Sequence, residues 1–580
     1  MSYPLPFTHR AATLAFMAAA LAPYVVRGNP AGLTVQSGSA TASAAGGHLT
    51  VTASHNAILN WQSFNLAPGE RTSFVQPSSS SVVWNKINDA SPSQVFGRLD
   101  ANGVVVLQNR AGFFFGPDAF VSAAGLVVTT ATATPVEGAA GLFWQFQGAP
   151  PAASIVNYGR LETGPSGSAF LIADRIENHG EIAAPGGTIG LAAGRDVLLS
   201  ERPDGRGLSA TVSLPSGSID NTGRLVADAG TVALHARVVN QGGLVQAASV
   251  RERHGVIELV AADAVTLGPN SVLSASGGEE GLSGGGSIVV KSGGSYADTA
   301  TSRLGVAGGA QGGDGGFVEI SAPVLPAIRA QLDGQAASGS RGGRLLLDPQ
   351  NIVISSGGGG TGSGSVGAGD PPAGGTLTLD VNSAFTGFSE ITLQATRNIT
   401  VAAGTQWDLG ASTGLTAPGS LLKLEAGNNV TVAAGAAILA AENWSVTIQA
   451  GRDFSAPDLV TPGVGSILFS GTGALQAQNG QVSLLAGNNV TVAAGHVRTV
   501  AGGDLTVRTL AGNIATGTKA NGFRFLPSGY AVDADLGGIS TAAGGDVTLA
   551  AGQDVVSFLP LAGGQQGNAG SGAFGAAPGD

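Results

Sequence analysis

The sequence contains no cysteine, only two methionines and few charged or aromatic residues. Without cysteine the chain cannot form a disulfide scaffold, a thiol catalytic site or a cysteine-ligated metal centre. Charged residues are 11% of the chain, well below the roughly 25% of ordinary domains. The net charge of −11 offers no basic surface for phosphate groups, so we expect no nucleic-acid partner.

Long apolar runs are also missing, because no stretch reaches the ~18 residues that a membrane-spanning helix needs. The apolar run at Ala11–Ala22 follows His9 and Arg10 and has the length of the central region of a signal peptide. A buried core helix is the alternative reading of this run. We predict a signal peptide at residues 1–27, with the Sec translocon as the partner during export.

Glycine, small residues and β-branched residues take the place of the missing types. The 580 residues include 93 glycines, and 43% of the chain is hydrophobic. This length exceeds one ordinary compact domain, and the hydrophobic content argues against a disordered chain. The glycines follow no three-residue period, which excludes collagen. Many short strands separated by turns are expected.

Internal repeats indicate how these strands are arranged. The segment AGNNVTVAAG occurs at residues 426–435 and again at 486–495, sixty residues apart. A second theme, Asn-x-Gly followed by an aliphatic residue, begins at Asn157, Asn178, Asn221 and Asn240, with spacings of 21, 43 and 19. We interpret 43 as two units of about 21, a length typical of one coil of a parallel β-helix.

The local pattern fits such a coil. In Gly230–Asn240 the side chains of Val232, Leu234 and Ala236 would point to one side of a strand. Asn and Gly would then turn the corner, since both tolerate positive φ. Asparagines at successive corners could form a hydrogen-bonded ladder. The predicted fold class is all-β, a right-handed parallel β-helix with a capped N-terminal domain.

Four ordered segments suggest a family. They are GNPAGLTVQSGSAT from Gly28, LNWQSFNLAPGERTSFVQPSSSSVVWNKI from Leu59, NDASPSQVFGRLDANGVVVLQN from Asn88, and NRAGFFFGPDAFVSAAGLVVTT from Asn109. Together they resemble the N-terminal secretion domain of filamentous haemagglutinin-like exoproteins of the two-partner secretion pathway. Residues 305–322 and 342–355 are similar to stretches of the β-helical part of these exoproteins.

The resemblance implies secretion by a dedicated outer-membrane barrel transporter, to the surface or surroundings of a Gram-negative-type bacterium. It also implies that Phe113, Phe114 and Phe115 are buried in the first coils. Where the family has Asn-Pro-Asn-Gly or Asn-Pro-Ser-Gly, this chain has Asn-Arg-Ala-Gly, which keeps the turn-forming ends and loses the proline. The secretion-motif residues implied by the resemblance are Asn65, Asn109, Gly112, Phe115 and Gly116, with Gly112 and Gly116 supplying turns.

The predicted domain organisation has six parts. These are a signal peptide at 1–27, a two-partner secretion domain at 28–145, β-helix repeats at 146–355, a Gly/Ser-rich linker or loop at 356–375, further β-helix repeats at 376–560, and a disordered tail at 561–580. The chain ends in AAPGD rather than in the terminal aromatic of an autotransporter barrel. A separate transporter is therefore expected.

Motifs of catalysis and metal binding are absent from the sequence. There is no phosphate-binding loop and no H-E-x-x-H helix. The segment Gly312–Ile320 lacks the Asp that a calcium-binding nonapeptide needs. We predict no catalytic residue, no metal and no cofactor. Glycosylation sequons begin at Asn398, Asn429, Asn443 and Asn489, but a turn asparagine followed by alternating Val and Thr creates a sequon by itself.

These observations favour an adhesin or haemagglutinin-like exoprotein that is not an enzyme. It would bind a surface receptor or a glycan on host cells or bacteria. Two alternatives stay open: a β-helical enzyme acting on polysaccharides, and a haemolysin or toxin carrier.

The signal peptide gives a first testable prediction. N-terminal sequencing of the exported protein should begin between Leu21 and Asn29, because small residues at Ala18, Ala20 and Ala22 suit signal peptidase. An intact Met1 on extracellular protein would contradict this.

Overall fold

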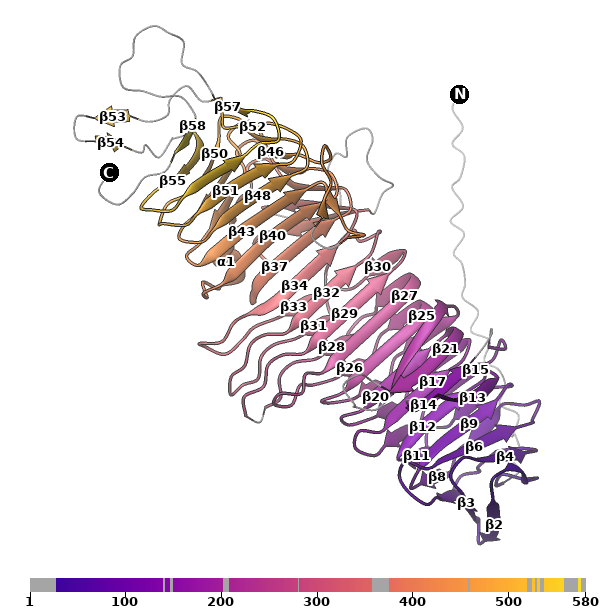
Figure 1. Cartoon of the computed structure of the whole chain (residues 1–580). Helices are drawn as coiled ribbons and strands as arrows, with labels where there is room; N and C mark the ends of the chain where they lie inside the picture. Colours follow the sequence, from indigo (N-terminus) through magenta and orange to yellow (C-terminus); the bar gives the residue numbers. More distant parts are fainter. Residues whose placement is uncertain are drawn as a thin grey trace, which may run out of the picture.

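The computed structural model describes residues 28–138, 141–146, 150–201, 208–279, 281–356, 375–456, 459–518, 524–526, 529–531, 537–557 and 572–574. The predicted signal peptide lies outside the described residues, as do residues 357–374 of the predicted linker and all but 572–574 of the predicted tail. The described coils stack into one elongated solenoid that runs from β2 to β55 (Figure 1).

Each coil contributes strands to up to three parallel sheets, here named faces A, B and C. Face A contains β4 (Ala57–Trp61), β6 (Val82–Ile87), β9 (Val104–Asn109), β12 (Gly125–Thr129), β17 (Ser168–Ile172), β20 (Thr188–Ala192), the first parts of β25 (Thr231–Gln241) and β27 (Val256–Leu267), β29 (Ser287–Ser292), β32 (Phe317–Ser321), β34 (Gly343–Asp348), β37 (Phe388–Ala395), β40 (Ser420–Ala426), β43 (Trp444–Ala450), β48 (Val482–Ala486), β51 (Leu505–Thr509) and β56 (Val547–Ala550).

Face B follows face A in each coil. It contains β7 (Ser93–Val95), β10 (Phe113–Phe115), β15 (Ser154–Asn157), β18 (Arg175–Asn178), β23 (Ser218–Asn221), the second parts of β25 and β27, and β30 (Ser295–Ala297); further along the chain come β35 (Asn351–Ser355), β36 (Thr376–Asp380), β38 (Asn398–Val401), β41 (Val430–Val432), β46 (Ile467–Phe469), β49 (Val490–Val492), β52 (Ile514–Ala515) and β57 (Val555–Val556).

Face C completes the coil. It contains β3 (His48–Ala53), β5 (Arg71–Val75), β8 (Arg98–Ala101), β11 (Phe120–Ala123), β16 (Arg160–Thr163), β19 (Glu181–Ala183), β24 (Arg224–Val226), β26 (Leu244–Gln246), β28 (Val272–Ser274), β31 (Arg303–Gly305) and β33 (Gln331–Asp333); further along come β39 (Gln406–Asp408), β42 (Ala437–Ala440), β47 (Ala474–Ala477), β50 (His496–Thr499), β55 (Gly538–Thr541) and β58 (Gly572–Phe574). The fold is thus the predicted right-handed parallel β-helix.

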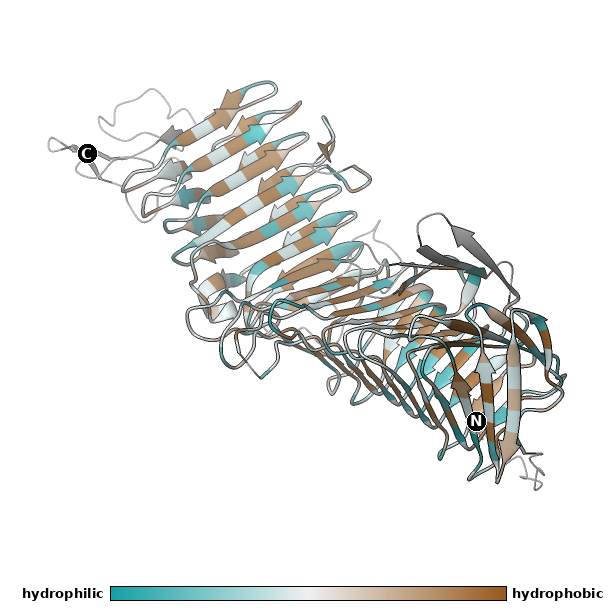
Figure 2. Cartoon of the chain, turned by 60° about the horizontal axis from the view of Figure 1, so that its bottom comes forward, coloured by the Kyte–Doolittle hydropathy of each residue, from teal (hydrophilic) through white to brown (hydrophobic). Residues whose placement is uncertain are grey.

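The inner sides of the three faces form one continuous apolar core. Val232, Leu234 and Ala236 are fully buried in it, as the alternating pattern predicted. Hydrophobic and polar residues alternate along many strands (Figure 2). Burial of each large aliphatic side chain stabilises the fold by about 1.5–3 kcal/mol. Because a single coil cannot enclose its inner face, this stabilisation depends on the neighbouring coils.

An antiparallel cap covers the N-terminal end of the core. There β1 (Thr34–Ser37) pairs with β4, and β2 (Ala40–Ala45) pairs with β3. Beneath them the rings of Trp61 and Phe64 meet edge to face with centroids 5.6 Å apart. The Trp61 Nε1–H donates to the buried Oδ1 of Asn85 at 2.9 Å. The cap keeps a strand edge from templating aggregation.

A four-stranded antiparallel sheet lies outside the helix and covers the start of face A. Its strands are β13 (Ala133–Gly138), β14 (Gly141–Phe146), β21 (Gly194–Glu201) and β22 (Leu208–Pro215). It forms a second apolar core in which Trp144 meets Trp84 of β6 at 5.3 Å. Val106 and Phe170 therefore point away from the helix interior and are still fully buried.

This external sheet corrects the interpretation of the 43-residue spacing. Asn178 aligns directly with Asn221, so the two asparagines are one coil apart. The additional residues form the hairpin of β21 and β22, which leaves the helix and returns to it. The sixty-residue repeat spans two coils, because Val430 aligns with Ile467 and Ile467 with Val490.

The predicted asparagine ladder is present at the end of the face B strands. Each side-chain Nδ2 donates to the side chain in the next coil: Asn157 to Asn178 at 2.8 Å, Asn178 to Asn221 at 2.7 Å. The ladder then continues from Asn221 to Gln241 at 2.7 Å, so the predicted fourth member, Asn240, is wrong by one residue. All ladder positions are buried, and each bond contributes about 0.5–1.5 kcal/mol.

The reason for the corner glycines also differs from the prediction. Neither the ladder asparagines nor the adjacent Gly159, Gly180 and Gly223 have positive φ. A Cβ atom on Gly180 or Gly223 would instead collide with the carbonyl oxygen of the preceding corner glycine. Stacked corners approach so closely that only glycine fits, whatever its dihedral angles.

The ladder predicts a clear difference between two asparagines. Asn178→Ala removes two buried hydrogen bonds, the one accepted from Asn157 and the one donated to Asn221. We therefore expect it to lower the free energy of unfolding by about 1–3 kcal/mol. Asn240→Ala is the matched control, because the half-buried Asn240 Nδ2 donates only to Asp220 at 2.7 Å. The urea midpoint, followed by circular dichroism, measures both. Equal midpoints would contradict the role of the ladder.

Candidate functional site: the secretion motif and the outer surface

The residues of the predicted secretion motif gather around one short strand, β7. The buried Asn109 ends β9, and its Nδ2 donates to the Ser93 Oγ at 2.9 Å. Its Oδ1 accepts the backbone N–H of Ala111 at 2.9 Å, which closes the turn. Asn109 therefore fixes its own turn and joins it to the preceding coil, and this needs no proline.

Gly112 ends the same turn with φ +110°, a conformation that disfavours any side chain. Its carbonyl accepts the Ser93 N–H at 3.0 Å. A Cβ atom there would lie 2.5 Å from the Ser154 carbonyl oxygen of the next coil. Glycine is thus required by both dihedral angle and space.

The other motif residues contact β7 farther along. Asn65 Oδ1 accepts the Gln94 N–H at 2.7 Å. Phe115 aligns with Val95, and the Gly116 N–H donates to the Val95 carbonyl at 2.8 Å. Gly116 has no positive φ; a side chain there would meet the Phe96 ring. All five motif residues are thus brought together by β7.

The burial expected for three phenylalanines holds for two. Phe113 and Phe115 lie in the core with rings stacked 6.1 Å apart. Phe114 points outward, because successive strand residues face opposite sides. There it continues a column of rings across four coils, with Phe96 at 5.7 Å and Tyr158 at 5.8 Å, and His179 stacks on Tyr158 at 4.6 Å.

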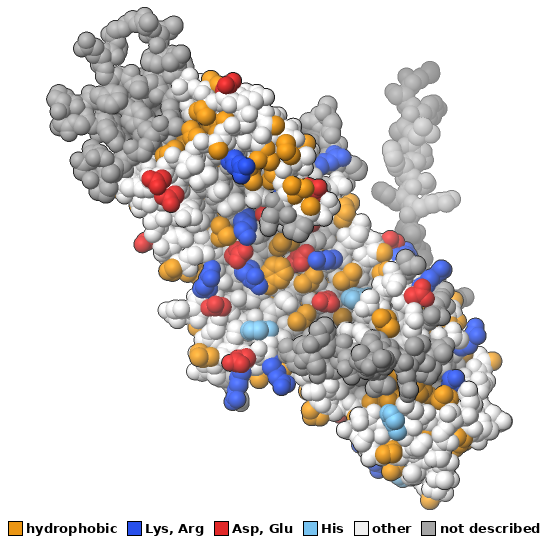
Figure 3. Space-filling model, in the orientation of Figure 1, with side chains coloured by type: hydrophobic (Ala, Val, Ile, Leu, Met, Phe, Trp, Pro, Cys, Tyr) orange, Lys and Arg blue, Asp and Glu red, His pale blue; other side chains and the backbone are white. Residues whose placement is uncertain are grey.

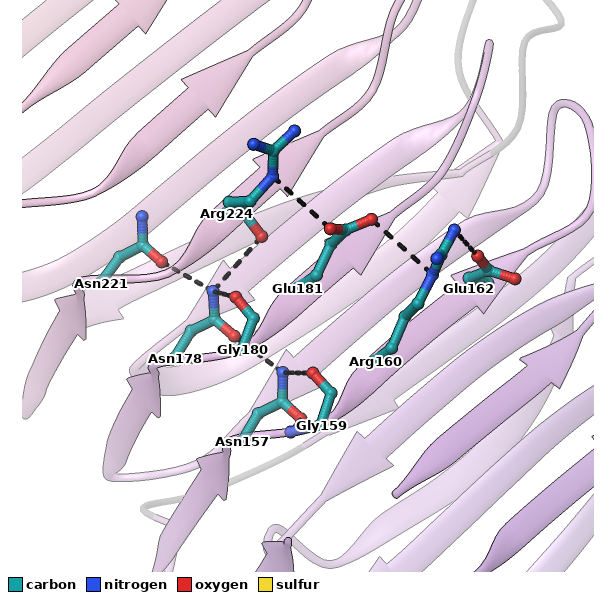
Figure 4. A network of polar contacts seen from close by, with 9 residues as sticks. All are labelled: Asn157, Gly159, Arg160, Glu162, Asn178, Gly180, Glu181, Asn221 and Arg224. Carbon is teal, nitrogen blue, oxygen red and sulfur yellow. Dashed lines mark hydrogen bonds and ion pairs between the residues drawn. The ribbon is translucent and has the colours of Figure 1, made fainter. Parts of the chain in front are cut away.

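A row of ion pairs lies on face C beside the asparagine ladder (Figure 4). Glu181 is placed between Arg160 at 3.7 Å and Arg224 at 3.5 Å in the neighbouring coils. Two coils before Arg160, a hydrogen bond and ion pair with Asp100 raise the pKa of Arg98. Sequence reasoning missed this row. The available signal was a charged residue directly after the corner glycine, as at Arg160, Glu181 and Arg224.

On face A lies Asp348, a carboxyl group whose pKa is raised by its surroundings. Charged side chains of both signs lie near one another in the middle of the surface in Figure 3. Burial, and next the negative charge of Glu319, raise the pKa of Asp348 to about 6, while Lys291 lowers it. Lys291 pairs with Glu319 at 2.9 Å. Scattered acidic residues in the sequence gave no sign of this grouping, because strands of three coils create it.

The sequon asparagines have a structural role in the coils. Asn398 Oδ1 accepts the Asn429 N–H at 3.2 Å, and Asn489 Oδ1 accepts the Asn513 N–H at 2.8 Å. These side chains join successive corners, as the turn interpretation of the sequons requires. Within the described ranges, no group of three His, Asp or Glu side chains could hold a metal ion, and no helix is long and apolar enough to cross a membrane.

Comparisons with known proteins assign the chain to a family. A family model described as the TPS secretion domain matches residues 27–323, just over half of the chain. The protein is thus a β-helical exoprotein of the two-partner secretion class. It belongs to the TPS secretion domain family, whose members are secreted from Gram-negative bacteria by a cognate outer-membrane transporter. The match includes the predicted secretion domain and continues into the predicted repeats.

Similar proteins come from Haemophilus influenzae. A heme/hemopexin-binding protein is 26% identical over 219 residues, which are 37% of this chain and 24% of that protein. Another protein of that name is 35% identical over 77 residues, 13% of this chain and 8% of the relative. The chain therefore matches at most about a quarter of these relatives' lengths. The crystal structure of the HMW1 secretion domain covers 79% of this chain and 100% of its own, with 19% identity and a TM-score of 0.39.

The geometry around β7 predicts which substitutions block secretion. Asn109→Ala removes the side-chain hydrogen bond from the turn to the Ser93 Oγ, and Gly112→Val forces a side chain against Ser154. We expect both variants to stay in the periplasm, because the first coils no longer present the motif in its native shape. Immunoblots of periplasm and medium measure this.

Arg110→Ala is the matched control, because Arg110 lies exposed in the same turn. It should be secreted like the native protein. Normal secretion of Asn109→Ala and Gly112→Val would show that the turn has no part in transporter recognition.

Proposed function

We propose that the protein is an adhesin, a secreted or surface-held exoprotein that binds a receptor or glycan on host cells or other bacteria, and that it is not an enzyme. The Sec translocon would carry it into the periplasm before its transporter exports it. The outward surface of the stacked coils is the observation that carries the proposal.

That surface repeats small polar groups in register. On face A, Thr447 aligns with Ser483, Ser483 with Thr506, and Thr506 with Thr548. The last two side chains are exposed. Hydroxyl groups thus recur at the strand spacing of about 4.8 Å. An extended, rigid array of this kind suits many weak contacts, which gain strength when many copies act on one cell.

The names of the relatives also support binding rather than catalysis, since both are described as binding proteins. We take from them the general class of function and not their ligands. The strongest counter-candidate within the described residues is Asp348, because a carboxyl group with a pKa of about 6 near Glu319 and Lys291 could act as a general acid or base.

A binding and cleavage assay on the secreted protein separates the two classes. The native protein and Asp348→Asn should both bind host cells or bacteria saturably, with equal affinity. Neither should shorten a uronic-acid polymer, measured by viscosity and released reducing ends. Cleavage by the native protein that Asp348→Asn lacks would overturn the proposal in favour of an enzyme.

A further inference from the structure

A polar groove on the C-terminal half of face C offers a defined site. It has a volume of about 660 Å³ and lies where β42 and β47 end. One end is marked by Asp408, which caps the short helix α1 (Leu409–Thr413) by accepting the Ala411 N–H at 3.0 Å. Grooves that hold small ligands have volumes of about 300–1,000 Å³.

The groove contains hydrogen-bonding groups with unused capacity. Within the described part of the chain, the side chains of Glu442 and Gln478 make no hydrogen bond or ion pair, although both line the groove. Arg498 Nε donates to Gln476 Oε1 at 2.8 Å, which leaves the Gln476 Nε2 as a donor. Carboxylates accept, and the glutamine side chains both donate and accept. Such a mixture suits hydroxyl groups, which do both.

The neighbouring corner is held in place independently of any ligand. Asn479 Oδ1 accepts the Asn443 N–H at 2.6 Å, and its Nδ2 donates to Asn443 Oδ1 at 3.0 Å. The groove is therefore formed before binding, which lowers the entropic cost of association. Between its polar groups, Leu439 and Ala441 supply apolar surface.

The charges of the groove limit the ligand. Asp408 and Glu442 are both acidic. Neither lysine nor arginine lines the groove, and the nearby Arg498 donates its Nε–H to the lining Gln476. The two lining carboxylates disfavour phosphate, sulfate and carboxylate groups there. The remaining chemistry is that of a neutral molecule with many hydroxyl groups and a C–H surface, which describes a neutral sugar.

We propose that this groove binds a neutral oligosaccharide, with Glu442 and Gln478 as its main hydrogen-bonding residues. This inference rests on the proposed adhesin function and gives it a glycan class and a location. The Asp408 carboxylate and the Gln476 amide bond further hydroxyl groups, and Leu439 and Ala441 contact the C–H face of the sugar.

A glycan array with the full secreted chain tests the proposal, followed by calorimetric titration of the best neutral oligosaccharide. The double variant Glu442→Ala/Gln478→Ala should bind it about tenfold or more weakly, since two hydrogen bonds are lost. The matched control is Glu390→Ala, whose carboxylate lies on face A and pairs with Lys423 at 3.7 Å. It should bind like the native chain, and urea midpoints should show all variants folded.

Three results would overturn the groove proposal: only acidic glycans bind, the double variant binds normally, or the control loses affinity equally. If the chain still binds cells in any of these cases, the proposed adhesin function stands without the groove. A chain that binds neither cells nor any glycan on the array overturns both the proposed function and the groove.

Discussion

The close stacking of one coil on the next is the constraint on which the rest of the structure depends. At the corners, backbone approaches backbone so closely that Gly180 and Gly223 leave no space for a Cβ atom. This approach brings the asparagine side chains of neighbouring coils within 2.8 Å. It also holds the inner apolar side chains in register, so core, ladder and corner glycines stabilise one another. In a chain with so few charged residues, this register determines which strands pair with one another.

The repeating coil could be predicted from the sequence, but the external antiparallel sheet could not. Alternation in Gly230–Asn240 identified the inner face correctly, because burial in a strand follows the chain directly. The external sheet was missed, since β14 and β21 are far apart in sequence and their pairing is antiparallel. That omission produced the wrong interpretation of the 43-residue spacing. Glycine was also credited with positive φ, whereas at the Asn-x-Gly corners of Gly180 and Gly223 lack of space is the reason for it.

At the candidate site, too, local features could be predicted from the sequence and contacts between coils could not. The turn from Asn109 to Gly112 could be predicted, because local hydrogen bonds and one positive φ determine it. Its attachment to β7 could not, since Ser93 belongs to another coil. Asp348 and the groove at Glu442 depend on residues that only stacking brings together. Patterns in one strand therefore reveal the fold, while chemistry between coils requires the three-dimensional register.

The region that matches the secretion family and the proposed binding surface lie on different parts of one scaffold. The cap, β7 and the external sheet lie at the N-terminal end, within the matched family region. The hydroxyl columns and the groove lie on later coils. Coils that form first can stabilise the coils that stack on them. This fits a secretion domain on the first coils and a proposed binding surface on later ones.

The most direct test of the central claim is to measure where the full chain accumulates in cells with and without the cognate outer-membrane transporter. We expect the chain in the medium or at the cell surface when the transporter is present, and in the periplasm when the transporter gene is deleted. Equal release from both strains would contradict two-partner secretion as the route.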